Sequence, residues 1–128
     1  MKLDSISIKH TDVLMGIKFG FSAGRESNLY QAFDASELAL KRIPVDATKD
    51  IKTVGLYKRD GHRGIIGLQL RGEEGEEPIL DEIWYNGEEE IALELHDIPA
   101  NHAIIGLFGR VEKEVLANVG FICWKTGE

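Results

Sequence analysis

The sequence predicts an all-β fold in which one folding unit occurs three times and three small antiparallel sheets share a single core. Residues 38–70 and residues 93–124 set out the same features in the same order. Each stretch begins with the spacing L-x-L-x-x-I-P and continues with a Val-Gly-Leu-Tyr or Ile-Gly-Leu-Phe run and a second apolar segment. Residues 5–19 repeat the second part of this unit. Internal repetition of this kind is typical of folds built from copies of one supersecondary unit.

Apolar residues recur at every second position within the matched runs. A period of two places such residues on one face of a β-strand. In two of the three runs the facing positions are glycine or polar, as in antiparallel strands that cover a core with one side. Because a single hairpin buries too little surface to be stable alone, we expect the three faces to close over one interior. The inward residues are Met15, Ile17, Phe19 and Phe21, then Ile66, Leu68 and Leu70, then Ala117, Val119, Phe121 and Cys123.

The first quarter of the chain predicts three strands. Residues 3–8 alternate between apolar and polar and predict the first strand, and residues 14–21 predict its partner after a turn at 10–13. Residues 22–28 are polar and predict a connection. Residues 29–33 then predict a short third strand.

Residues 35–42 are the one segment in which local propensity and the repeat disagree. They contain helix formers, and Ser36 is suited to be an N-cap. Their counterpart, residues 90–95, alternates as a strand, and copies of one unit should keep one conformation. We therefore predict a strand in both places. Each is ended by a proline, Pro44 or Pro99, because proline lacks the amide donor that a sheet requires.

The rest of the chain predicts further strands and two strong turns. An Asp-Gly pair at residues 60–61 is typical of a tight hairpin, an Asn-Gly pair follows at 86–87, and a charged loop at 109–114 joins the last two strands. No linker or break in composition interrupts the chain, so we expect about ten strands in a single domain, residues 1–128. The strands expected here are 52–58, 64–71, 79–85, 90–95, 103–108 and 115–124.

The composition excludes several functional classes. The formal net charge is −7, and acidic residues gather at 73–77 and 88–90, which leaves no basic face for nucleic acid. No segment approaches the roughly 20 apolar residues of a membrane span, and the start of the chain has no apolar run of signal length. The single cysteine, Cys123, excludes an internal disulfide. We expect a soluble, intracellular protein.

No stretch of the sequence spells out a reaction. The histidines, His10, His62, His96 and His102, do not have metal-ligand spacing. There is no nucleophile elbow, phosphate loop or dinucleotide fingerprint. Cys123 falls on the inward face of its run and is predicted to be a buried apolar residue. We therefore expect no enzyme, no cofactor and no metal.

The end of the chain carries a family resemblance. An apolar run at 104–108 leads into Gly109 and Arg110, and after a loop the chain continues with Leu116 and the Val-Gly-Phe sequence of residues 119–121. With the matching order of motifs in residues 38–70, this pattern resembles the jacalin-related lectins over nearly the whole chain. The resemblance implies a three-sided β-prism of antiparallel Greek-key sheets with a pseudo-threefold repeat. It also implies carbohydrate binding.

Two departures from the family bear on that function. The family binds sugar through the aspartate of a G-x-x-x-D loop, whose place is taken here by Ala117, and the family's glycine-rich opening strand has no counterpart. Alanine cannot accept the hydrogen bonds that a carboxylate accepts from sugar hydroxyls, so an atypical or degenerate site is expected. The candidate ligand-binding residues lie in three apical loops: Gly109, Arg110, Glu112, Lys113 and Glu114 in the third, His62 and Arg63 in the second, and Asp12 in the first.

Two functional hypotheses remain open. The chain is a lectin-like module that binds glycan, or it is a non-enzymatic module for protein interaction or oligomerisation that has lost sugar binding. Trp84 and Tyr85 precede a polar turn, a position in which aromatic rings stack on sugars or contact partners. Ile122 and Trp124 fall on the outer face of the last strand, where exposed apolar residues indicate an interface.

Overall fold

The computed structural model describes residues 2–59, 61–112 and 115–125. Strands make up 54% of the structure, and the helical elements in the described part are two short 3-10 turns, so the predicted all-β class is confirmed. The 3-10 turns are η1 (Ser22–Gly24) and η2 (Phe33–Ala35). The strands are β1 (Leu3–His10), β2 (Leu14–Phe21), β3 (Tyr30–Gln31), β4 (Lys41–Pro44), β5 (Thr53–Arg59), β6 (Gly67–Arg71), β7 (Leu80–Ile83), β8 (Ile91–Asp97), β9 (His102–Val111) and β10 (Leu116–Lys125).

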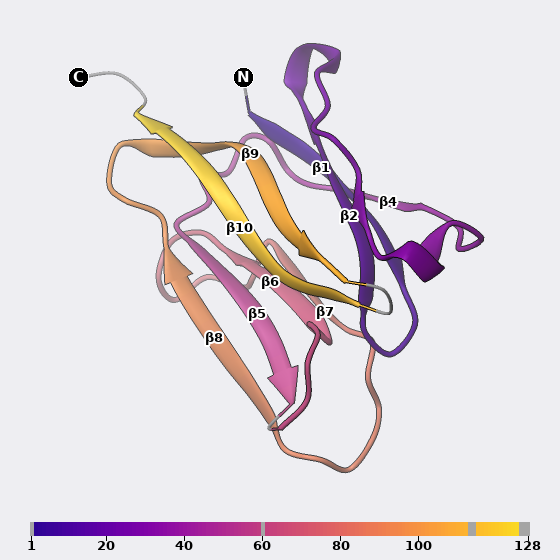
Figure 1. Ribbon diagram of the computed structural model, residues 1–128. Helices are drawn as coiled ribbons and strands as arrows, with labels where there is room; N and C mark the ends of the chain where they lie inside the picture. The colour runs from indigo at the N-terminus through magenta and orange to yellow at the C-terminus, as the bar shows by residue number, and fades with distance from the viewer. Residues whose placement is uncertain (1, 60, 113–114, 126–128) are drawn as a thin grey trace.

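The strands form three antiparallel sheets (Figure 1). The first has the order β3-β2-β1-β4, the second has the order β7-β6-β5-β8, and the third is the long hairpin of β9 and β10. In both four-stranded sheets the fourth strand returns to lie beside the first, which is the Greek-key arrangement. In the described part of the chain, the third sheet has two strands only.

The predicted alternation places one face of the β1–β2 hairpin in the core. Ile6 pairs with Phe19 and Ile8 pairs with Ile17 across the two strands. All four side chains are at most 1% exposed. Directly opposed apolar side chains are the unit that stabilises a sheet. The intervening Lys18 lies on the other face. The alternation in the sequence therefore matches the alternation in burial along this part of the hairpin.

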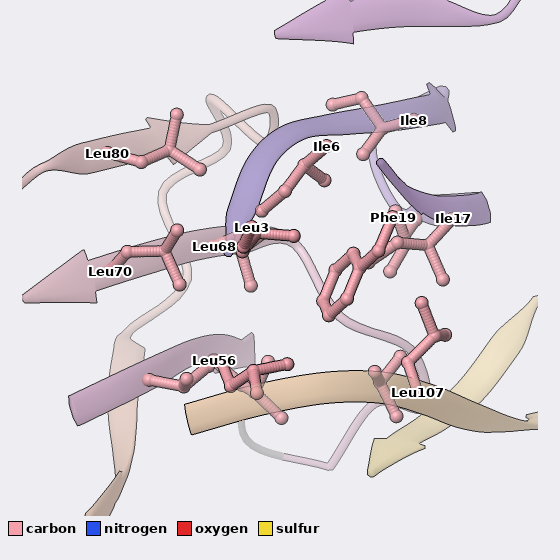
Figure 2. Close-up of a cluster of buried hydrophobic side chains, with 14 of the residues drawn as sticks. Leu3, Ile6, Ile8, Ile17, Phe19, Leu56, Leu68, Leu70, Leu80 and Leu107 are labelled. Atoms are coloured by element: carbon pink, nitrogen blue, oxygen red, sulfur yellow. The ribbon is translucent and has the colours of Figure 1, made fainter. Parts of the chain in front are cut away.

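One buried cluster receives side chains from all three sheets (Figure 2). Ile17 of the first sheet, Leu68 of the second and Val119 of the third are 0%, 1% and 6% exposed. The rings of Phe19 and Phe121 stack between the first and third sheets, with centroids 5.9 Å apart. Side chains of the three matched runs therefore meet in a single interior. Met15 is an exception to the predicted inward set: it packs with Ala32 and Ala35 in a separate cluster, while Leu14 enters the main core, because the register of β1 and β2 shifts between Lys9 and His10.

Residues 35–42 form neither a helix nor the strand that the repeat predicts. Turn η2 leads into a bend, and sheet pairing begins only at Lys41. Ala35 is fully buried, and its carbonyl accepts hydrogen bonds from the Leu38 amide at 3.0 Å and from the Lys9 ammonium at 3.2 Å. These tertiary contacts hold a turn at this point, so the two copies of the unit differ in conformation.

The tight hairpin predicted at the Asp-Gly pair includes Asp60, which lies outside the described residues. On either side of it, the His62 amide donates a hydrogen bond to the Arg59 carbonyl at 3.3 Å. Ladder pairing between β5 and β6 ends at Tyr57 and Gly67, while β5 continues to Arg59 against β8. In the connection that follows, Ile65 and Ile66 are both fully buried, and the Ile65 carbonyl accepts a hydrogen bond from the Leu14 amide of β2 at 2.6 Å. Burying an isoleucine stabilises a fold by about 1.5–3 kcal/mol, so these two residues fix the path of the connection.

Several other strand ends differ from prediction, and those of β9 and β7 affect the candidate site. Strand β9 continues to Val111, which pairs with Leu116, so Gly109 and Arg110 lie in the strand and not in the loop. Strand β7 ends at Ile83, which leaves residues 84–85 in the following connection. Charged side chains on an exposed strand face do not interrupt backbone pairing. The prediction therefore ended β9 too early when it assigned the charged residues to a loop.

Candidate functional site

Three connections meet at one end of the molecule, the end where β9 stops and β10 begins in Figure 1. We call this end the apex and define it by residues 11–13, 33, 61–66, 110, 112 and 115. Gly64 adopts a φ of +94°, and a Cβ at this position would lie 3.3 Å from Val13 and 3.5 Å from Val115. The apical loops that the sequence places in three separate repeats are therefore in contact.

Glu112 is the centre of a charged cluster at the apex. Its Oε1 accepts a hydrogen bond from Nη1 of Arg63 at 2.6 Å and lies 4.0 Å from Nη2 of Arg110. The Glu112 side chain is 23% exposed, whereas the arginine side chains are 74% and 71% exposed. Hydrogen bonds between guanidinium and carboxylate groups are among the stronger ones in proteins. The carboxylate is thus held between two guanidinium groups that keep most of their donors accessible.

Sequence reasoning missed Phe33, which also belongs to the apex. Its amide donates a hydrogen bond to the Glu112 carbonyl at 3.4 Å, while the side chain is 75% exposed. The flanking Ala32 and Ala35 are 1% and 0% exposed and anchor the turn on both sides. The sequence offered one indication, an aromatic residue between Ala32 and Ala35. Because a strand was predicted at 29–33, the turn that directs the Phe33 ring outward was not predicted.

A second charged cluster lies between the β5–β6 and β7–β8 connections. Nη1 of Arg59 and Nε2 of His62 are each 3.3 Å from Oε2 of Glu89. The Arg59 guanidinium also lies 4.2 Å from the centre of the Tyr85 ring, within the range of a cation–π contact. His62 therefore pairs with Glu89 and not with the carboxylate of Glu112.

Trp84 is a packing residue at the base of the apex. Its ring stacks on His10 with centroids 4.9 Å apart and an interplanar angle of 16°. The indole N–H donates a hydrogen bond to Glu82 at 3.1 Å, and the ring packs against the main core. Tyr85 is also half-buried, and its ring lies against the Arg59 guanidinium.

The remaining predicted ligand-binding residues are dispersed. Asp12 is exposed in the turn between β1 and β2. Gly109 lies in β9 against Tyr30, where a Cβ would be 3.3 Å from that residue's own Cβ. Lys113, Glu114 and the side chain of Ala117 lie outside the described part of the structure.

The outer face of the β9–β10 hairpin exposes large apolar side chains. Phe108, Ile122 and Trp124 are 56%, 45% and 67% exposed, and we call these three the outer row. The ring of Phe108 covers Gly120, where a side chain would collide with it. The amide of Val119 donates to the Asn118 side chain at 2.9 Å.

Cys123 and the potential metal ligands were compared with what a reactive thiol or a metal site requires, within the described residues. Burial raises the pKa of the Cys123 thiol, which disfavours the reactive thiolate. No set of three or more His, Cys, Asp and Glu side chains is placed to hold a metal ion in the part of the chain that the structure describes. Within the same residues, no helix has the length and apolar character needed to cross a membrane.

Comparison with known proteins identifies the fold. No family model matches the sequence, and no curated protein sequence does. Among solved structures, the lectin MPA complexed with T-antigen disaccharide is 15% identical, with a TM-score of 0.65, over 96% of this chain and 92% of that chain. Malaysian banana lectin is 17% identical, with a TM-score of 0.62, over 98% of this chain and 84% of that chain. Both are jacalin-related lectins, so the predicted resemblance is confirmed at the level of the fold.

Proposed function

We propose that residues 1–128 form a single jacalin-like domain that binds carbohydrate non-enzymatically through an atypical site at the apex. The observation that carries this proposal is the convergence of Arg63 of the β5–β6 connection with Arg110 at the end of β9 and Glu112 just after it. The lectin fold of the two similar structures supports it, although a fold alone does not specify a site. An intracellular setting is part of the proposal, since the chain has a single cysteine.

The apex offers the chemistry that a saccharide requires. A sugar hydroxyl leaves water only when donors and acceptors in the site replace its hydrogen bonds. Arg63 and Arg110 supply donors from exposed guanidinium groups, and Glu112 holds them in position. Phe33, whose amide donates to the Glu112 carbonyl, adds an exposed ring at this end of the molecule. The arginines donate hydrogen bonds to sugar oxygens and do not reproduce the acceptor that the family's aspartate provides, which is why the site is atypical.

The three-sided prism and its pseudo-threefold repeat are part of the same proposal. Strand orders β3-β2-β1-β4 and β7-β6-β5-β8 are equivalent, which supports descent from one Greek-key unit. The shared burial of Ile17, Leu68 and Val119 supports three sides around one interior. The β9–β10 hairpin would be the third side.

A glycan array with the purified domain tests the function. We expect the wild type to bind a defined set of saccharides. We expect the double variant Arg63→Ala/Arg110→Ala to lose at least about tenfold in affinity, because each charged hydrogen bond contributes about 1.5–3 kcal/mol. Arg25→Ala is the matched control, since Arg25 is exposed in the connection after β2, away from the apical loops. A blank array for the wild type would contradict carbohydrate binding.

The outer row favours a second candidate function, self-association. Phe108, Ile122 and Trp124 present apolar surface on one strand pair, and sheet edges and exposed apolar patches are common sites of protein contact. Trp84 and Tyr85 are less suited to this role, because both are half-buried and already paired. Sedimentation of the wild type and of Trp124→Ser separates the possibilities: a dimer that becomes a monomer in the variant supports self-association, and a monomeric wild type contradicts it.

A further inference from the structure

We propose that the open edge of β10 binds an extended segment of a partner protein, which adds a strand to the β9–β10 sheet and packs apolar side chains into a groove beside it. The groove lies between β10 and the second sheet, and none of its residues belongs to the apex. This interaction surface is therefore independent of carbohydrate binding.

The two four-stranded sheets show which element accompanies a strand in the position of β10. The repeat makes β10 equivalent to β2 and β6. Each of these has a second antiparallel neighbour, β3 or β7, on the side away from its hairpin partner. In the part of the chain that the structure describes, β10 pairs with β9 alone. One side of a ten-residue strand is thus open, and open strand edges readily pair with strands of other chains.

The equivalent strands also identify the backbone groups at the open edge. The carbonyls of Phe19 in β2 and Leu70 in β6 each accept a hydrogen bond at 2.8 Å from an amide of the segment beside them. Phe121 is the equivalent residue of β10. Two positions earlier, the Val119 amide donates to the side chain of the adjacent Asn118 at 2.9 Å. Because alternate residues of an antiparallel strand direct their backbone groups to the same side, both residues face the open edge.

The groove along this edge reaches the main core. It has a volume of about 490 Å³, and Val54 and Val119, which line it, are 0% and 6% exposed. In the other two sheets, the neighbouring strand contributes an apolar side chain to the core at this position, Tyr30 from β3 and Leu80 from β7. A strand added to β10 should therefore carry apolar residues at alternate positions, which all point to one face.

Charge restricts the partner further. At the rim of the groove, Lys58 and Glu94 are already paired with each other at 2.7 Å. The chain as a whole has a net charge of −7, which favours association with a basic segment over an acidic one. A second copy of this chain carries the same negative charge and is a less favourable occupant. The partner segment is thus extended, apolar at alternate positions and flanked by basic residues.

Calorimetry with the intact domain tests the proposal, with a designed peptide as the probe. The peptide has roughly nine residues, within the usual length of a strand. It alternates Thr with Leu, Val or Tyr and has Lys at both ends. We expect it to bind at least about tenfold more tightly than a scrambled peptide of the same composition, because only alternation places the apolar side chains on one face.

N-methylation of single peptide residues tests backbone pairing. Methylation of the amides that face β10 removes donors and should weaken binding about tenfold. Methylation of the intervening amides should leave the affinity unchanged, because these amides point away from β10. Equal weakening by both sets of methylated peptides would overturn the addition of a strand.

Cys123 reports whether the peptide binds in the groove. It lines the groove and is the single cysteine of the chain, so its alkylation by iodoacetamide reads one position. Because the reactivity of a thiol depends on its accessibility, saturating peptide should slow alkylation at least about fivefold. Peptide binding that leaves the alkylation rate unchanged would place the site elsewhere and overturn the proposal.

Asn118→Ala tests the register at the edge. It removes the side chain that occupies the Val119 amide, so it should strengthen peptide binding about two- to fivefold. Asn28→Ala is the matched control, since Asn28 is an exposed asparagine in the first sheet's β2–β3 connection. Equal affinities of the two variants would contradict pairing at Val119. Circular dichroism of each variant verifies that the fold is intact.

Two outcomes concern the occupant. A domain that is monomeric in sedimentation and has a reactive Cys123 supports a groove open to a partner. A dimer in which Cys123 is protected without peptide would assign the groove to a second copy and overturn the proposal. The absence of peptide binding, together with a positive glycan array, would overturn this inference and leave carbohydrate binding in place.

Discussion

Replacement of Gly64 by alanine tests whether the apex depends on contact among its three loops. Gly64 has a φ of +94°, a left-handed conformation that costs a residue with a side chain about 1–2 kcal/mol. The new Cβ would lie 3.3 Å from Val13, which would have to move by a few tenths of an ångström, and 3.5 Å from Val115, which is an ordinary van der Waals contact. Alanine also reduces the entropy of the unfolded chain, which returns about 0.4–1 kcal/mol. The backbone effect alone is therefore a loss of about 1 kcal/mol, and the contacts add to it.

Gly75→Ala is the matched control. Gly75 has a φ of +86° and lies in an acidic loop where a Cβ would meet nothing within 4 Å. It carries the same backbone cost without the contacts, so the difference between the two variants isolates the meeting of the loops. Only Gly64→Ala is expected to displace Val13 and to add a contact with Val115, whose carbonyl accepts a hydrogen bond from the Glu112 amide at 3.1 Å.

Urea unfolding and saccharide binding provide the two readouts. With a slope of about 1–3 kcal/mol per molar urea, a loss of about 1–2 kcal/mol moves the midpoint by roughly 1 M. Gly64→Ala should lower the midpoint more than Gly75→Ala and should weaken ligand affinity at the apex, while Gly75→Ala leaves the affinity unchanged. If the two variants lose equal stability and equal affinity, the loops do not depend on one another and the reasoning is wrong.

Three further predictions follow from the fold. Leu68→Ala, at a position 1% exposed in the common core, should lower the free energy of unfolding by about 2–5 kcal/mol in urea titrations, and a loss below about 1 kcal/mol would contradict a shared interior. Burial and the hydrogen bond to Asp81 raise the pKa of Tyr57 to about 12, so its contribution to stability is complete below pH 10 and lost as the pH rises through 12. Tyr57→Phe should remove that alkaline dependence in thermal unfolding, and an unchanged profile would refute it. The hydrogen bond from Lys58 lowers the pKa of Glu94. The contribution of Glu94 to stability is therefore present above the ordinary carboxyl pKa and is lost as the pH falls through the lowered value. Glu94→Gln should reduce the loss of stability at acid pH, and Glu74→Gln serves as an exposed control.

The apical site could be predicted in part. Arg63, Arg110 and Glu112 were selected as polar tips of aligned repeats, and the structure brings these three together. Gly109 and Asp12 were selected by the same reasoning; Gly109 lies in β9 against Tyr30, and Asp12 is exposed in the apical turn between β1 and β2. Phe33 was not predicted as a site residue. Its ring is exposed because Ala32 and Ala35 are buried in a turn, and the alternation of apolar residues does not predict that turn.

The sequence by itself determined the class of the fold and most of the common core. These features follow from a period of two in apolar side chains, which is a local property of an extended backbone. Tertiary structure decided that Met15 packs in a separate cluster and that Leu95 of β8 is exposed. It also decided the turn at residues 35–42, the path of residues 61–66 and the meeting of Gly64 with Val13 and Val115. Each depends on contacts between residues that are distant in the chain. The free energy gained from burial and hydrogen bonding in these contacts exceeds the local conformational preference, and no short window of sequence contains both partners.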